Sequence, residues 1–269
     1  MKGLAGRAVL VTGAASGIGR AAAVRLVAEG ASVALLDRDA AAVEAAANPL
    51  GARAVALTAD VSVEAAVRDA VARAADALGG LGGLVTSAGI FDPGDYRPLH
   101  EVELETFQKT LGVNLVGTFL AVKYALPHLL AHGGAIVTIA STAALRAHGI
   151  GSGYTASKGG VVALTRLLAS QYGERGVRTN CVCPGITATG MTGHVVRDPE
   201  YLRKVTPRIP LRRVAEAEEI AAVACHLLSD DASYVNGQII AADGGSTVLG
   251  KTTGRPARAD RPIERRERG

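Results

Sequence analysis

The chain has 269 residues, of which 48% are hydrophobic and 3% aromatic, and its formal net charge is +4. This length and composition suit one α/β domain whose core consists mainly of Val, Leu, Ile and Ala. Seven basic and three acidic residues follow Leu249 and carry the whole excess of charge, so the rest of the chain is neutral. A neutral body argues against a nucleic-acid-binding protein.

The start of the chain and its apolar segments bear on where the protein is expected to be located. Met1-Lys2-Gly3 leads into an apolar strand without a signal-peptide pattern, and no stretch approaches the roughly 20 apolar residues of a membrane span. We therefore expect a cytoplasmic protein without a membrane partner. Residues 250–269 are rich in Pro and Arg, which predicts a disordered tail after a domain of residues 1–249; a basic contact arm is the alternative.

The three cysteines are Cys181, Cys183 and Cys225. They are too few for a disulfide framework, and no His or Cys stands near them at metal-ligand spacing. We interpret them as buried thiols and predict no metal site.

Short apolar runs alternate with helix-forming segments along the chain. Strands are predicted at Ala8–Val11, Ser32–Leu36, Ala54–Leu57, Gly83–Thr86, Ala135–Ile139, Arg178–Val182 and Gln238–Ala241. The helices between them include Glu64–Leu78, Phe107–Leu130, Gly153–Tyr172 and Ala217–Leu228, and Pro127 is expected to bend or end the second of these. The alternation predicts an α/β, Rossmann-type, doubly wound sheet of seven parallel strands flanked by helices. Ligands of such a sheet bind at the carboxyl ends of the strands.

A glycine-rich turn follows the first predicted strand. Gly13, Gly17 and Gly19 stand between this strand and an Ala-rich helix that begins near Arg20. Strand, glycine turn and helix in this order are typical of a dinucleotide site, because the glycines admit the pyrophosphate and the helix N-terminus supplies N–H donors. We expect the turn to bind a dinucleotide through Gly13, Ser16, Gly17, Ile18 and Gly19.

An acidic residue ends the second predicted strand. Asp37 stands 24 residues after Gly13, where a carboxylate hydrogen-bonds the adenosine ribose and repels a 2′-phosphate. No Lys or Arg occurs in Ala14-Ala15-Ser16 to attract that phosphate. The sequence therefore predicts NAD rather than NADP, and we interpret the neighbouring Arg38 as stacked on the adenine or solvated.

A tyrosine and a lysine one helical turn apart carry the candidate chemistry. Tyr154 and Lys158 share a helix face, and Ser141 ends an apolar strand thirteen residues before Tyr154. A free tyrosine holds its proton to about pH 10, whereas a cation about 4 Å away at an effective dielectric near 20 favours the phenolate by roughly 4 kcal/mol, or about three pKa units. We therefore expect a lowered pKa for Tyr154 and interpret this residue as a general base for a hydroxyl proton. Ser141 would hydrogen-bond the substrate oxygen.

These motifs follow the order of the short-chain dehydrogenase/reductase family, which the chain resembles from about Leu4 to Leu249. The matching motifs are Thr12-Gly13-x-x-x-Gly17-x-Gly19, Asp60-Val61, Ala88-Gly89, Asn114, Ser141, Tyr154-x-x-x-Lys158, Pro184-Gly185 with Thr189 beyond, and Asp243-Gly244-Gly245. One departure is Ser87, which stands where the family has an asparagine.

The resemblance implies roles for further residues. Lys158 would also hold the nicotinamide ribose, and Asn114 would hold a water that links Lys158 to solvent; a bond to a neighbouring carbonyl is the alternative for Asn114. Asp60 would contact the adenine, although a helix cap before Glu64 explains it equally well. Thr189 would hold the carboxamide. The other cofactor contacts implied in this way are Val61, Ala88, Gly89, Pro184, Gly185 and Thr187.

The substrate side of the site is predicted less directly. Residues 190–213 connect the sixth strand to the last helix and contain several prolines, which predicts a lid of one or two short helices. Met191 either lines an apolar pocket or holds this lid to the body. His148 and His194 are candidate polar pocket residues.

Taken together, the motifs predict an NAD-dependent oxidoreductase that interconverts a secondary alcohol and a ketone by hydride transfer. Two alternatives remain open: a 3-oxoacyl-carrier-protein-type reductase, and a catalytically silent nucleotide-binding regulator. Asp37 argues against the first, because that role usually favours NADP, and the intact Ser141, Tyr154 and Lys158 argue against the second. The long apolar helices Phe107–Leu130 and Gly153–Tyr172, which pair between subunits in the family, predict a homotetramer or homodimer.

Overall fold

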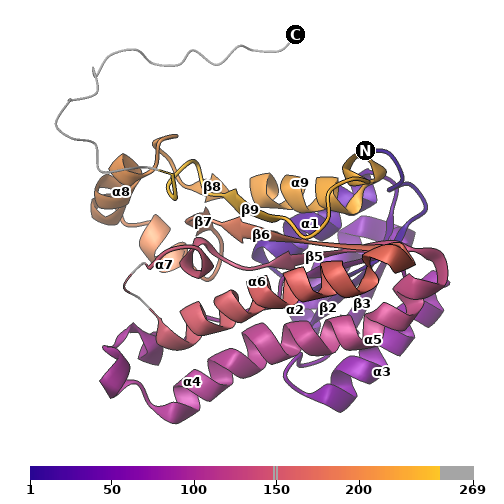
Figure 1. Cartoon of the computed structure of the whole chain (residues 1–269), viewed down its shortest axis with the longest axis horizontal. Helices are drawn as coiled ribbons and strands as arrows, with labels where there is room; N and C mark the ends of the chain where they lie inside the picture. The colour runs from indigo at the N-terminus through magenta and orange to yellow at the C-terminus, as the bar shows by residue number, and fades with distance from the viewer. Residues whose placement is uncertain (148, 150, 249–269) are drawn as a thin grey trace, which may run out of the picture.

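The computed structural model describes residues 1–147, 149 and 151–248, and a seven-stranded parallel sheet forms its centre (Figure 1). The strands are β1 (Ala8–Thr12), β2 (Ser32–Asp37), β3 (Ala54–Thr58), β4 (Gly83–Thr86), β5 (Gly134–Ile139), β6 (Val177–Pro184) and β9 (Ile239–Ala242). They lie in the order β3-β2-β1-β4-β5-β6-β9, so the chain order reverses between β1 and β4. The predicted fold class is confirmed, and a crevice is expected where the order reverses.

Helices cover both faces of the sheet (Figure 1). One face carries α1 (Gly17–Ala28), α2 (Ala40–Ala47) and α9 (Ala217–Leu228), and the other carries α3 (Glu64–Leu78), α5 (Gly117–His132) and α6 (Ser152–Tyr172). Successive side chains of a strand point to opposite faces of the sheet and so contribute to both cores. In β1, Val9 and Val11 belong to the core beneath α1, and Leu10 belongs to the core beneath α3. This is why the strands read as continuous apolar runs in the sequence.

The predicted long helix over Phe107–Leu130 is three segments in the structure. These are α4 (Leu104–Leu111), a π-helical turn (Gly112–Val116) and α5. Pro127 lies inside α5, which continues to His132, so of the two expected effects, a bend or an end of the helix, the end does not occur. The π-helical turn contains Asn114, and such turns inside α-helices often occur at functional sites.

The same helical stretch bears on the membrane prediction. Leu104–His132 is long and apolar enough to cross a membrane by length and composition, and half of its most apolar window is buried in the protein. Its buried residues pack against β4, β5 and α3, as the core helix of a folded domain does. The sequence-based expectation that no stretch reaches this length and apolarity was therefore too strict.

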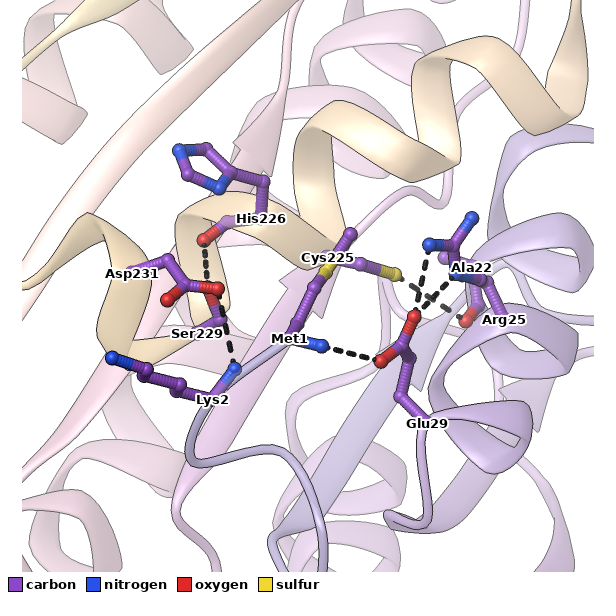
Figure 2. Close-up of polar contacts among 9 residues, drawn as sticks. All are labelled: Met1, Lys2, Ala22, Arg25, Glu29, Cys225, His226, Ser229 and Asp231. Carbon is purple, nitrogen blue, oxygen red and sulfur yellow. Dashed lines mark hydrogen bonds and ion pairs between the residues drawn. The ribbon is translucent and has the colours of Figure 1, made fainter.

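The segment that precedes β1 packs between α1 and α9 (Figure 2). The Met1 amine forms an ion pair with Glu29 Oε2 at 2.7 Å, and the Lys2 N–H donates to Asp231 Oδ2 at 3.2 Å. Beside them, Cys225 Sγ lies 3.8 Å from the Ala22 carbonyl, and burial raises the pKa of this thiol to about 12. These contacts lie near the start of β1, opposite the carboxyl ends of the strands.

The remaining cysteines, Cys181 and Cys183, are also buried and unbridged, as predicted, with their Sγ atoms 3.9 Å apart. Among the residues that the structure describes, no group of three or more His, Cys, Asp or Glu side chains is arranged to hold a metal ion.

Beyond β6 lies the segment predicted to be a lid. It contains α7 (Gly193–Val196), α8 (Pro199–Val205) and a 3-10 turn (Thr206–Arg208). A separate two-stranded sheet of β7 (Thr187–Ala188) and β8 (Ala215–Glu216) joins its two ends. The predicted tail, residues 250–269, lies outside the described residues.

Candidate active site

A cavity of about 640 Å³ lies at the carboxyl ends of the parallel strands. Residues that follow β1, β2, β3, β4, β5 and β6 all reach it, because parallel strands end at one edge of the sheet. The sequence-predicted residues that line it are Gly13, Ser16, Gly17, Ile18, Asp37, Arg38, Asp60, Val61, Ala88, Gly89, Ser141, Tyr154, Lys158, Pro184, Gly185, Thr187, Thr189 and Met191.

Two of the predicted residues that the structure describes, Gly19 and Asn114, are not among those that line this cavity. Both lie behind its wall and support it. His148 lies outside the described residues, and of His194 the structure describes only its position in α7. The cavity also includes residues that the sequence analysis missed, among them Phe91 and Thr192.

The glycine turn forms one wall of the cavity. Gly13 has a φ of +67°, and a Cβ there would lie 2.7 Å from the Ala88 Cα; a Cβ on Gly19 would lie 2.2 Å from the Gly13 carbonyl oxygen. Ser16, the N-cap residue of α1, makes no side-chain hydrogen bond to the N-terminal N–H groups of this helix. The turn is therefore a cradle that a side chain would fill, next to a helix N-terminus that suits an anion, and these residues fit a dinucleotide pyrophosphate.

Asp37 is tied to the glycine turn. Its carboxylate accepts hydrogen bonds from the Ala15 N–H at 3.1 Å and from the Asp39 N–H at 3.3 Å. Because the carboxylate lines the cavity at the end of β2, it is positioned where an adenosine ribose binds in sheets of this class.

Asp60 makes a local turn. Its Oδ1 accepts from the Ser62 hydroxyl at 2.6 Å and from the Ser62 N–H at 2.8 Å, and these bonds lower the pKa of the carboxyl. The N-cap residue of α3 is Val63, so Asp60 does not cap this helix. Asp60 lines the cavity, and its contact with the adenine stays a prediction.

Ser141, Tyr154 and Lys158 meet on the opposite wall. Ser141 follows β5, and its Oγ accepts from the Ala143 N–H at 3.1 Å; the same side chain lowers the pKa of Tyr154. Tyr154 and Lys158 lie one turn apart on α6. Lys158 is 5% exposed, and its Nζ donates to the Ile139 carbonyl at 3.0 Å.

The protein groups alone do not acidify the tyrosine, which corrects the sequence-based prediction. Burial raises the pKa of Tyr154 above its ordinary value, and the neighbouring Ser141 side chain opposes this only in part. The Lys158 ammonium lies 5.7 Å from the centroid of the Tyr154 ring and is not among the groups that lower the pKa of this phenol. Burial also lowers the pKa of Lys158 to about 8. The spacing of Tyr154 and Lys158 in the sequence does not show how much water folding removes from the two side chains.

Asn114 holds the loop that follows β4. Its Oδ1 accepts from the Ile90 N–H at 2.7 Å, and its Nδ2 donates to the Ile90 carbonyl at 3.0 Å and to the Ser157 hydroxyl at 3.1 Å. The carbonyl that it bonds therefore belongs to a distant loop and not to its own helix. A Cβ on Gly89 would lie 3.3 Å from Asn114 Oδ1 and 3.4 Å from Lys158 Nζ, so this loop, Asn114 and Lys158 lie in close contact.

A parallel sheet with a glycine cradle, an acidic residue after β2 and a Ser–Tyr–Lys cluster on one cavity defines a nucleotide-dependent oxidoreductase fold. A family model described as "Enoyl-(Acyl carrier protein) reductase" matches residues 13–247. The chain is 39% identical over 248 residues to 2-(R)-hydroxypropyl-CoM dehydrogenase of Xanthobacter autotrophicus, with 90% of this chain and 99% of that protein covered. It is 42% identical over 245 residues to meso-2,3-butanediol dehydrogenase of Serratia marcescens, with 90% and 95% covered.

A solved structure agrees with these sequence comparisons. The crystal structure of levodione reductase superposes with a TM-score of 0.86 at 38% identity, and the match covers 91% of this chain and 99% of that one. The chain belongs to the short-chain dehydrogenase/reductase family. It is an oxidoreductase of this family, whose members use NAD or NADP and whose relatives at this level of identity include alcohol dehydrogenases and ketone reductases.

Proposed function

We propose that this protein is a cytoplasmic, NAD-dependent oxidoreductase that interconverts a secondary alcohol and a ketone. The observation that carries the proposal is the group of Ser141, Tyr154 and the buried Lys158, which line the same cavity as the glycine turn. The Asp37 carboxylate in the same cavity supports NAD over NADP.

The glycine turn, Asp37 and Lys158 would hold NAD, which when bound would supply or accept the hydride. Ser141 donates a hydrogen bond to the substrate oxygen and fixes its distance from Tyr154. Tyr154 gives its phenolic proton to that oxygen during reduction and takes it back during oxidation. Since burial raises the pKa of Tyr154, the phenol is protonated at neutral pH, which is the form that reduction requires.

Lys158 contributes a buried positive charge to the same wall. Its pKa of about 8 keeps it mostly protonated at neutral pH, and the Ile139 carbonyl uses only one of its three donors. The ammonium therefore has donor capacity for the nicotinamide ribose, and its charge favours the phenolate that forms when Tyr154 gives up its proton. Asn114 supports this arrangement through the loop that it holds.

The substrate end of the cavity favours an alcohol with an apolar substituent. Phe91 and Met191 line the cavity with Tyr154, and the Phe91 and Tyr154 ring centroids are 5.1 Å apart. A substrate that presents its carbinol to Tyr154 would therefore place its substituents beside an aromatic ring and a thioether.

A reductase of 3-oxoacyl groups on a carrier is the second candidate. The family model is described as an enoyl-(acyl carrier protein) reductase, which shares the carrier with this candidate but not the 3-oxo group. A 3-oxoacyl thioester in the assay panel distinguishes the two activities. A catalytically silent regulator would bind NAD and turn over no member of the panel.

The test is a panel of secondary alcohols and ketones with NAD and NADP, followed at the absorbance of the reduced nicotinamide. Tyr154→Phe removes the proton donor and should lower kcat by roughly a hundredfold or more, while the Kd for NAD stays within about twofold. Tyr172→Phe is the matched control, because Tyr172 lies on the same helix and packs in the core away from the cavity. Full activity of Tyr154→Phe would refute the proposed proton transfer.

We also propose that the chain assembles as a homotetramer or homodimer. Val116 and Phe119 near the start of α5 and Leu167 on α6 are 43%, 47% and 51% exposed, which is unfavourable for large apolar side chains on a monomer. Sedimentation velocity measures the assembly, and a monomer at micromolar concentration would contradict this part.

A further inference from the structure

The helix that carries Tyr154 lacks a local cap at its N-terminus. Its N-cap residue is Gly151, with φ +65°, and this residue provides no side-chain acceptor. No acidic residue occurs in the first turn of α6. The first N–H groups of an α-helix have no partners within the helix, so a buried helix start requires acceptors from elsewhere.

Those acceptors come from Asp95, which lies in a 3-10 turn (Pro93–Tyr96) between β4 and α4. Asp95 Oδ1 accepts from the Gly153 N–H at 2.9 Å and from the Ser152 hydroxyl at 3.0 Å. Its Oδ2 accepts from the Tyr154 N–H at 2.8 Å. The Asp95 backbone carbonyl also accepts from the Gly151 N–H at 3.1 Å. One residue therefore holds every residue from Gly151 to Tyr154.

Asp95 is fully buried, and among residues 1–147, 149 and 151–248 it forms no ion pair. A buried carboxylate is costly unless hydrogen bonds satisfy it. Here the compensation comes from two N–H groups, a hydroxyl and the positive end of a 21-residue helix. The negative charge of Asp95 is thus stabilised by the N-terminus of α6 and not by a cation.

The same loop also holds the tyrosine ring. The Phe91 ring centroid is 5.1 Å from that of Tyr154 and 4.5 Å from that of Tyr96. A Cβ on Gly151 would lie 3.0 Å from Tyr154 Cβ and 2.8 Å from Phe91 Cε2, so the Gly151 backbone and these two side chains are closely packed. Tyr154 is fixed at its backbone by Asp95 and at its ring by Phe91.

We propose that Asp95 is a positioning residue for Tyr154: its carboxylate sets the place of the phenol relative to Ser141 and Lys158. This rests on the proposed role of Tyr154 in proton transfer. Asp95 itself does not line the cavity, so it acts through the Tyr154 backbone and not through a contact with substrate or cofactor.

Asp95→Asn is the informative substitution, because it hardly changes the volume of the side chain and removes one of the hydrogen bonds that the carboxylate accepts. An amide has one acceptor oxygen, and its NH2 group would face an N–H donor where the second carboxylate oxygen now accepts. Asp92→Asn is the matched control. Asp92 belongs to the same loop, where it accepts from the Gly94 N–H at 2.9 Å and pairs with Lys109 at 2.9 Å, without a bond to α6.

The experiment measures kcat, KM and the Kd for NAD in the wild type and in both variants. Asp95→Asn should lower kcat by about tenfold to a hundredfold, since a displaced reacting group is costly even at a small displacement, and leave the Kd for NAD within about twofold. Asp92→Asn should retain the wild-type kcat. If Asp95→Asn does not fold, Ser152→Ala, which removes one of the three side-chain contacts of Asp95, should lower kcat in the same way by a smaller factor.

A second readout is independent of turnover. With 13Cζ-labelled tyrosine, the Tyr154 resonance among the six tyrosines is identified by its absence in Tyr154→Phe. It should shift in Asp95→Asn and not in Asp92→Asn. If the wild type turns over no substrate, the proposed function fails, and the resonance still tests the positioning. An unshifted resonance, or a wild-type kcat in Asp95→Asn with only a lowered melting temperature, would overturn the proposal.

Discussion

Replacement of Asp37 should change which dinucleotide the protein prefers. The Asp37 carboxylate lines the cavity where we propose that the adenosine binds, and it accepts from the Ala15 N–H at 3.1 Å. Asp37→Ala removes both the charge and the acceptor, whereas Asp37→Asn keeps an acceptor oxygen for Ala15 and removes the charge. A comparison of the two variants therefore separates cofactor selection from support of the glycine turn.

The magnitudes follow from ordinary values for charged groups. A hydrogen bond to a charged acceptor contributes about 1.5–3 kcal/mol, so Asp37→Ala should weaken NAD binding by roughly tenfold to a hundredfold. A carboxylate about 5 Å from a phosphate charge repels it by about 1–3 kcal/mol, and solvent at this open site favours the lower value. Asp37→Asn should therefore strengthen NADP binding by about tenfold and weaken NAD binding less than Asp37→Ala does.

Isothermal titration calorimetry with NAD and NADP measures both constants for each variant. Glu44→Gln is the control, because this carboxylate is exposed on the neighbouring helix α2 and does not line the cavity. It should leave the ratio of the two constants within about twofold. If NADP affinity is the same in the wild type and in Asp37→Asn, Asp37 does not select the cofactor and the NAD assignment loses its basis.

Two further predictions concern the glycine turn and the phenol. Gly19→Ala would bring a Cβ to 2.2 Å from the Gly13 carbonyl oxygen, so dinucleotide binding should be lost by calorimetry, while circular dichroism should still show the α/β fold; normal NAD affinity would contradict the close approach. Burial raises the pKa of Tyr154 above 10, so this group contributes stability below pH 10 that is lost as the pH rises through the raised value. The ultraviolet difference titration of wild type against Tyr154→Phe should show its phenolate only above pH 10, and an ionised phenol at neutral pH in the protein alone would refute this.

The sequence was sufficient for features that depend on local pattern. Apolar runs of strand length, separated by helix-period segments, predicted all seven parallel strands, because a strand buried on both faces must be apolar throughout. The glycine turn and Asp37 could be placed for the same reason, since each directly follows a strand. The strand ends then bring these residues to one edge of the sheet without any further information.

Only the tertiary structure shows which residues hold Tyr154 and its surroundings in place. Asp95 lies 57 residues before Ser152, and Asn114 lies 24 residues after the loop that it holds, so no spacing rule links either residue to its partners. The pKa of Tyr154 depends on how much water the folded chain removes from the phenol, and the distance to Lys158 depends on the Ile139 carbonyl that binds the ammonium. Local sequence determines which residues follow each strand, whereas desolvation and long-range hydrogen bonds arise only when distant segments pack together.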